Sequence, residues 1–178
     1  MASEFLNLDN DALIDFCQKH IPNNNSGTGL LDITLPELQP LLTAVEKSAN
    51  ELHTRLGLNS KYQQRIQKCW ATVNYPTAVR QAHTHPDGFF SCVYYPYAEE
   101  GSGDLHMLNP FPEMLPVVRP EIVGEKNKYW METMVIPPRV GGLIIFPSWL
   151  WHYVDIGDMS KTRISFAMDT RVELINGV

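Results

Sequence analysis

Hydrophobic positions along the chain recur at helical spacing in the first third and at strand spacing from Lys68 onward. Between residues 38 and 56, leucine, valine and alanine recur every three or four positions, which predicts an amphipathic helix with Gly57 as its C-terminal cap. Residues 9–20 mix acidic and apolar positions and predict a shorter amphipathic helix. We expect the longer helix to cover the back of a sheet.

After Lys68, short β-type runs are separated by turn residues. They predict strands near residues 69–75, 80–85, 89–95, 103–108, 131–136, 142–146, 152–156 and 162–169. Short strands after a helical lead-in predict a mainly β fold, a jelly roll or double-stranded β-helix barrel with helices packed on its outer face. We expect a single domain over 1–178, with a helical lead-in at 1–67 and the β-helix core, carrying the metal site, at 68–172.

The 178 residues carry a formal net charge of -6. This disfavours a nucleic-acid-binding surface, since phosphate contacts need clustered Lys and Arg. The cysteines at 17, 69 and 92 are odd in number and form no Cys-x-x-Cys pattern, so neither a disulfide framework nor a zinc knuckle is expected. Neither a signal peptide nor an apolar run of roughly 20 residues is recognisable. We therefore expect a soluble, cytoplasmic protein with no nucleic-acid or membrane partner.

The connection at 109–130 is long and contains four of the thirteen prolines. A loop of this length in a compact domain is often a lid or a binding loop. The sequence leaves open whether this loop is a lid, and it leaves the oligomeric state open as well.

Side chains that can bind a metal or an anion gather in two stretches of the sequence, residues 83–87 and residues 152–163. Non-haem iron that activates oxygen needs two histidines and a carboxylate on one face. A 2-oxo acid co-substrate also needs a fixed guanidinium for its distal carboxylate. The residues that offer these groups are His83, His85, Asp87, His152 and Arg163. The two stretches together predict a metal site beside an anion site.

Period two within the last predicted strand separates its residues into two faces. One face, expected to pack on the helices, holds Ile164, Phe166 and Met168. The other face holds Arg163, Ser165, Ala167 and Asp169. A guanidinium that points into a barrel needs an anion, because an unpaired buried charge is costly. That anion is either a co-substrate carboxylate or one of three aspartates, Asp155, Asp158 and Asp169.

Four motifs link these residues to a known family. They are His83-Thr-His85-Pro, the segment Ser91–Tyr95, the segment Phe146–His152 and Arg163-Ile-Ser165. Over residues 70–169 the chain resembles the Fe(II)/2-oxoglutarate-dependent oxygenases, a double-stranded β-helix superfamily. It is most similar to a branch found in bacteria and phages.

The resemblance implies a role for each matching residue. His152 matches the distal iron ligand, and Arg163 with Ser165 matches the residues that bind the C5 carboxylate of 2-oxoglutarate. Tyr95 matches a strand tyrosine that binds the same carboxylate in prolyl-hydroxylase relatives. Asn74 lies where some relatives hold the co-substrate from the first barrel strand.

The proximal ligands can be assigned in two registers. In the first register, His83 is the proximal histidine and His85 takes the carboxylate position, so the ligands are His83, His85 and His152. In the second, His85 is the proximal histidine and Asp87 completes a His-x-Asp pattern with His152. The branch that the chain resembles has its His-x-His-Pro motif in register with His83 and His85, and this resemblance favours the first register.

Two functions from different classes remain in view. The resemblance predicts a dioxygenase that uses iron(II), 2-oxoglutarate and oxygen to hydroxylate a small-molecule or peptidyl substrate, releasing succinate and carbon dioxide. The alternative is a cupin-like barrel that binds a metal or ligand without oxygenase chemistry. A cupin gives no reason for the Arg-x-Ser pair at 163–165. The substrate itself cannot be read from the sequence.

Overall fold

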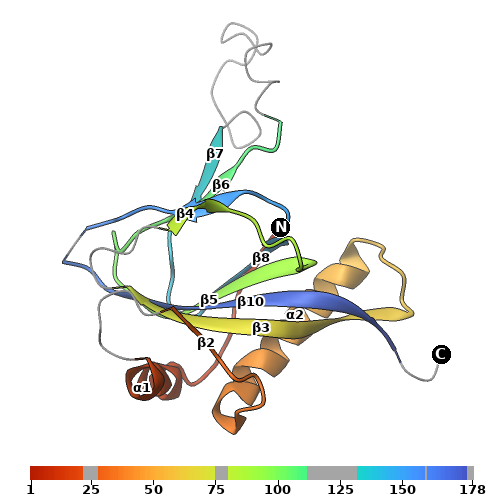
Figure 1. Cartoon of the computed structure of the whole chain (residues 1–178), viewed down its shortest axis with the longest axis horizontal. Helices are drawn as coiled ribbons and strands as arrows, with labels where there is room; N and C mark the ends of the chain where they lie inside the picture. The colour runs from red at the N-terminus through yellow and green to blue at the C-terminus, as the bar shows by residue number, and fades with distance from the viewer. Residues whose placement is uncertain (22–27, 75–79, 112–131, 159, 176–178) are drawn as a thin grey trace, which may run out of the picture.

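The structure is a computed structural model, and it describes residues 1–21, 28–74, 80–111, 132–158 and 160–175. Within these residues, a larger and a smaller antiparallel sheet face each other, and helices cover the outer face of the larger sheet (Figure 1). The helical segments are α1 (Asn10–His20), the 3-10 turn η1 (Pro36–Leu38) and α2 (Gln39–Arg55). The arrangement confirms the predicted mainly β fold with helices on its outer face.

The larger sheet has six strands in the order β1-β8-β5-β10-β3-β2. Their bounds are Ala2–Phe5 (β1), Gly142–Pro147 (β8), Phe90–Ala98 (β5), Arg163–Leu174 (β10), Tyr62–Asn74 (β3) and Thr28–Leu30 (β2). The smaller sheet has four strands in the order β4-β9-β6-β7. Their bounds are Arg80–His83 (β4), His152–Val154 (β9), Leu105–Leu108 (β6) and Thr133–Ile136 (β7).

Both helices begin or end where the sequence provides the required chemistry. The side chain of Asp9 accepts a hydrogen bond from the backbone N–H of Ala12 at 3.0 Å, so it caps the first turn of α1. Gly57 has a φ of 69° just beyond α2, a conformation that glycine adopts at no steric cost. The buried stripe of α2 packs into the main core, which also contains residues of α1 and of the larger sheet.

Strand β10 joins the helix-side core to the space between the sheets. Ile164, Phe166 and Met168 are buried in the core cluster that includes both helices, as the period-two pattern predicted. Arg163 and Ser165 point the other way and line a cavity between the sheets. The direction of each side chain on β10 therefore follows from strand alternation.

The segment before residue 68 contributes more strand than the sequence predicted. Strands β1 and β2 form the two edges of the larger sheet, and β3 begins at Tyr62 rather than near residue 69. Most side chains of β1 are exposed, so this strand lacks the alternation of apolar and polar residues that identifies a strand in a sequence. Edge pairing with β8 orders it instead.

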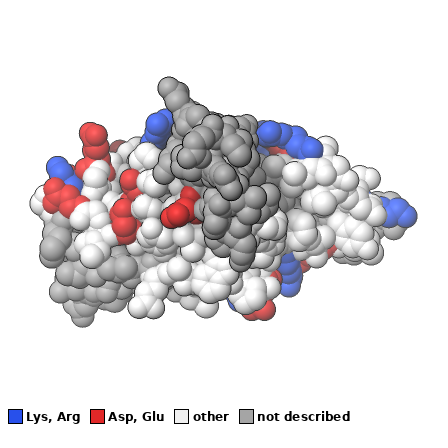
Figure 2. Space-filling view, turned by 90° about the horizontal axis from the view of Figure 1, so that it is seen from above, with Lys and Arg blue, Asp and Glu red and all other residues white. Residues whose placement is uncertain are grey.

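Figure 2 shows both signs of charge on the face seen from above, with acidic side chains gathered mainly toward its left end. Over the described part of the chain, this face presents no extended basic surface. Within the same residues, no helix combines the length and the apolar character that crossing a membrane requires.

Candidate metal centre

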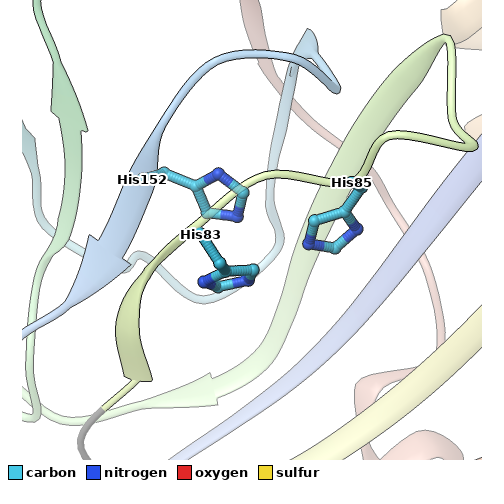
Figure 3. Close-up of side chains that lie close together, drawn as sticks. All are labelled: His83, His85 and His152. Carbon is cyan, nitrogen blue, oxygen red and sulfur yellow. The ribbon is translucent and has the colours of Figure 1, made fainter.

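Three histidine rings converge in the space between the sheets (Figure 3). His83 ends β4, His152 begins β9, and these two residues are paired across the strands. His85 lies on the loop that follows β4. One candidate ligand atom from each ring lies within 4.8 Å of those of the other two. A single cation can therefore contact all three rings after small adjustments.

Two of the three rings are oriented by backbone carbonyls. The Nδ1 of His83 lies 2.7 Å from the carbonyl oxygen of Gln81, and the Nδ1 of His152 lies 2.9 Å from that of Leu150. A carbonyl only accepts hydrogen bonds, so each Nδ1 must carry the proton. The Nε2 of each ring then keeps a lone pair, which is the form that binds a metal.

The third ring is oriented by a carboxylate. The Nδ1 of His85 lies 2.8 Å from both carboxylate oxygens of Asp169 on β10, which is buried. The hydroxyl of Ser91 donates a hydrogen bond to Asp169 at 2.8 Å, and the hydroxyl of Ser148 lies 3.0 Å from that of Ser91. Trp70 packs edge-on against the His85 ring, with 5.6 Å between the ring centroids.

Burial keeps His152 neutral. The pKa of His152 is lowered to about 4, mainly by burial and also by the nearby rings of His83 and His85, against the hydrogen bond to Leu150 and the charge of Asp169, which both act to raise it. Because this pKa lies below the ordinary value of 6.5, the imidazole is in its metal-binding form throughout the physiological range.

Asp87 lies apart from the three histidines. Its carboxylate makes an ion pair with Lys68 at 3.5 Å, and its side chain is 80% exposed. Among the described residues, the cluster that could hold a metal consists of His83, His85 and His152. The structure thus brings together the candidate ligands of the first register and leaves the carboxylate of the second on the surface.

The donor set fits a divalent transition metal. Neutral imidazoles suit iron, zinc, copper and nickel, and three of them on one side of an ion leave positions open on the other. All three histidines line a cavity of about 300 Å³ between the sheets. That cavity offers room for a small co-substrate beside the ion.

Arg163 lies in the same cavity as the histidines. It is only 2% exposed, and its Nη1 donates a hydrogen bond to the carbonyl oxygen of Gly103 at 2.8 Å. Tyr95 and Ser165 line the cavity too. Burial raises the pKa of Tyr95 to about 12, with the positive charge of Arg163 acting against the rise, so the phenol stays neutral and able to donate.

The three aspartates considered as partners of Arg163 have other described contacts. Asp155 accepts hydrogen bonds from the backbone N–H of Asp104 and from His106. Asp158 accepts from Ser160 within its own turn, while Asp169 engages His85 as above. Burial acts to raise the pKa of the Asp155 carboxyl, but the hydrogen bonds from His106 and Asp104 lower it, and the charges of His106 and Arg163 add to this lowering.

Asn74 ends β3 directly opposite Arg163, but its side chain lies outside the described residues. Most of the long connection at 109–130 also lies outside them, so the question of a lid stays as the sequence left it.

Thr72 and Trp70 line the cavity and were not predicted. Period two counted back from Asn74 along β3 would have found both.

The chain is similar to one sequence family over its strand-rich part. Residues 68–169 match the family described as "Putative 2OG-Fe(II) oxygenase", which is more than half of the chain. No curated protein matches the sequence.

Several solved structures share the fold at low identity. A Pseudomonas putida prolyl-4-hydroxylase is 16% identical with a TM-score of 0.62, over 96% of this chain and 92% of that one. A collagen prolyl hydroxylase of Paramecium Bursaria Chlorella virus-1, in complex with 2OG, is 14% identical with a TM-score of 0.58, over 99% and 97%. The non-heme alpha ketoglutarate dependent epimerase SnoN is 10% identical with a TM-score of 0.61, over 94% and 76%.

Proposed function

Since the chain belongs to the 2OG-Fe(II) oxygenase family, we propose that it hydroxylates a small-molecule or peptidyl substrate, with iron(II) and 2-oxoglutarate as cofactors and oxygen as the oxidant. The proposed metal ligands are His83, His85 and His152. The proposed binding site for the distal carboxylate of 2-oxoglutarate is formed by Arg163, Ser165, Tyr95 and Asn74.

One observation carries this proposal: a single cavity is lined by both the three-histidine cluster and Arg163. A set of metal-binding nitrogens and a guanidinium in one cavity can hold the two ends of a single small molecule. A dicarboxylic 2-oxo acid needs both groups, because it binds the metal at one end and a cation at the other.

Iron(II) with 2-oxoglutarate supplies, when bound, the activation of oxygen that oxidises an unreactive C–H bond as the co-substrate loses carbon dioxide and becomes succinate. The protein's own part is to place the reactants. His152 contributes a neutral nitrogen donor, while the apolar side chains of Leu105 and Phe146 line the cavity and limit access of water.

Arg163 provides the specificity for a dicarboxylic co-substrate. Its planar guanidinium matches a carboxylate in two parallel hydrogen bonds, which a lysine ammonium does not. The neutral phenol of Tyr95 and the hydroxyl of Ser165 are further donors in the same cavity. Hydroxylation is the proposed outcome because the family's chemistry oxidises C–H bonds. A different outcome is also possible with this fold, since SnoN is an epimerase.

The proposal is tested by mixing the protein with iron(II) and 2-oxoglutarate without oxygen. We expect an absorption band near the visible range that needs both components, and succinate release once oxygen and a substrate are added. A protein that binds iron(II) but gives no band with 2-oxoglutarate would be a metal-binding barrel of another class.

The ligand assignment is tested by two neighbouring substitutions. His83→Ala is expected to abolish iron(II) binding, because it removes one of three donors from the cluster. Asp87→Ala is the matched control and is expected to leave binding unchanged, since its carboxylate pairs with Lys68 at the surface. The opposite pattern, measured by anaerobic calorimetry, would establish the register with Asp87 as a ligand.

A further inference from the structure

The three histidines of the cluster are not held in the same way. His83 and His152 donate from Nδ1 to neutral backbone carbonyls two residues away. His85 donates instead to a carboxylate 84 residues away in the sequence and on the opposite sheet. It is also the one that lies outside a strand, on the loop after β4. Strand pairing therefore does not direct its side chain.

Asp169 is placed for this contact by the larger sheet. It lies on the inward face of β10, and the pairing of β10 with β3 shifts register between Asp169 and Thr170. Such bulges re-aim neighbouring side chains and are frequent beside functional sites. Asp169 is 3% exposed, and the ion pair that its carboxylate makes among the described residues is the one with His85.

A set of small buried groups closes around Asp169. Ser91 donates to its Oδ1, and the backbone N–H of His85 donates to the carbonyl oxygen of Ser148 at 2.8 Å. A Cβ at Gly88 would come within 2.5 Å of the Ser148 hydroxyl and 3.3 Å of the Asp169 Cβ. The loop that carries His85 thus packs tightly onto the network that holds the carboxylate.

We propose that Asp169 is a positioning residue of the metal site, acting through His85. This inference rests on the proposed ligand set. Three neutral histidines lack the negative charge that a ligand carboxylate brings to an oxygenase site. A carboxylate bonded to the far nitrogen of a ligand histidine fixes the tautomer and ring orientation and makes the metal-binding nitrogen more basic. Asp169 thus supplies, through its hydrogen bond with His85, the negative charge that a site with three histidine ligands lacks.

The test compares Asp169→Asn with the wild type in binding of manganese(II), an oxygen-stable substitute for iron(II), and of cobalt(II). Asparagine keeps the shape but removes the charge, and its amide N–H favours the other tautomer of His85, which cannot bind metal through Nε2. We expect metal affinity to fall about 10- to 100-fold, as for other partners of ligand histidines. The cobalt(II) absorption spectrum should change as well, which a purely structural role of Asp169 would not cause.

Asp155→Asn is the matched control. Asp155 also holds a histidine by a 2.9 Å contact, but that histidine is His106, outside the metal cluster. The Asp155→Asn substitution should leave manganese(II) affinity within about twofold of the wild type. Nitrogen-15 NMR of the histidine rings in the metal-free protein gives an independent readout. It should show His85 protonated on Nδ1 in the wild type and altered in Asp169→Asn.

If Asp169→Asn does not fold, Ser91→Ala tests the same idea more gently. It removes one hydrogen bond to the carboxylate, and affinity should fall about two- to tenfold. Unchanged metal affinity and an unchanged cobalt(II) spectrum in a folded Asp169→Asn or in Ser91→Ala would overturn the inference. A wild type that binds metal but gives no band with 2-oxoglutarate would overturn the proposed function alone, and a wild type that binds no metal would overturn both.

Discussion

The two ends of the cavity are built by different means. At the metal end, the histidines come from strands of four and three residues in the smaller sheet and from a loop. At the arginine end, Arg163 begins a twelve-residue strand that lies between two neighbours in the larger sheet. Ser165, two residues further along the same strand, lines the cavity as well.

This difference shows which structural features aim a side chain. In a long central strand, alternation fixes the direction of each residue, and pairing on both sides holds the backbone. Short strands and loops give weaker directions, so the three histidines rely on hydrogen bonds at Nδ1. The metal end should therefore respond strongly to the loss of single side-chain contacts, and the arginine end to changes in its ligand chemistry.

The largest expected effect is at the metal end. His152→Ala should abolish measurable iron(II) binding, because two remaining imidazoles rarely hold a ferrous ion at an open site. Anaerobic calorimetry measures the affinity directly. His106→Ala is the control, since His106 is on the neighbouring strand β6 but belongs to the pair with Asp155. Unchanged iron(II) affinity in His152→Ala would remove this residue from the site.

At the arginine end, the co-substrate should be lost and the metal kept. Arg163→Ala should weaken 2-oxoglutarate binding by about a hundredfold or more, since each charge-assisted hydrogen bond contributes about 1.5–3 kcal/mol. Arg163→Lys should fall between this variant and the wild type, because it keeps the charge and loses the fork. A thermal-shift series with manganese(II), with and without 2-oxoglutarate, separates the two ligands.

The same series can contradict this prediction. If Arg163 only supports the fold, Arg163→Ala should be less stable without ligands, and 2-oxoglutarate should stabilise the wild type no more than the variant. That outcome would mean that Arg163 does not bind 2-oxoglutarate and that the arginine end has only a structural role.

Much of the fold could be predicted from the sequence, for physical reasons. Buried elements leave a period in the sequence, so α2 and the inward and outward faces of β10 were predicted correctly. The fold class is confirmed by the solved structures, and the family, whose description names iron(II) and 2-oxoglutarate, is confirmed by the family match. Edge strands β1 and β2 were missed because backbone hydrogen bonds order them, and such bonds leave no hydrophobic period in the sequence.

The candidate site was harder to predict than the fold. Motif spacing indicated His83, His85 and His152, but two registers remained open because spacing alone does not reveal which side chains converge. Asp169 was recognised as inward-facing, yet its contact with His85 depends on how the two sheets meet. No local pattern carries information about that meeting, so this pair could only come from the three-dimensional structure.

A smaller effect is expected from the turn that receives the Arg163 hydrogen bond. Gly103 has a φ of 102°, and a Cβ there would come within 2.7 Å of the Asp155 carbonyl oxygen. Gly103→Ala should therefore lower the free energy of unfolding by about 1–3 kcal/mol. It should also weaken 2-oxoglutarate binding, because the carbonyl of residue 103 orients the guanidinium. Chemical denaturation and the thermal-shift series measure the two effects, and manganese(II) affinity should not change.

The smallest expected effect concerns Tyr95, which tests whether the arginine end acts through more than its charge. Tyr95 is 1% exposed on β5, and its phenol stays neutral because burial raises the pKa to about 12. Tyr95→Phe keeps the ring and removes the donor, so 2-oxoglutarate binding should weaken by about tenfold, close to the loss of one hydrogen bond to a charged group. Tyr94→Phe is the matched control. Its hydroxyl donates to Asn10 of α1 on the opposite face of the sheet, so co-substrate affinity should stay the same while stability falls slightly. Equal affinities in the two variants would mean that Tyr95 only packs in the barrel, and that Arg163 and its strand neighbours bind the carboxylate without it.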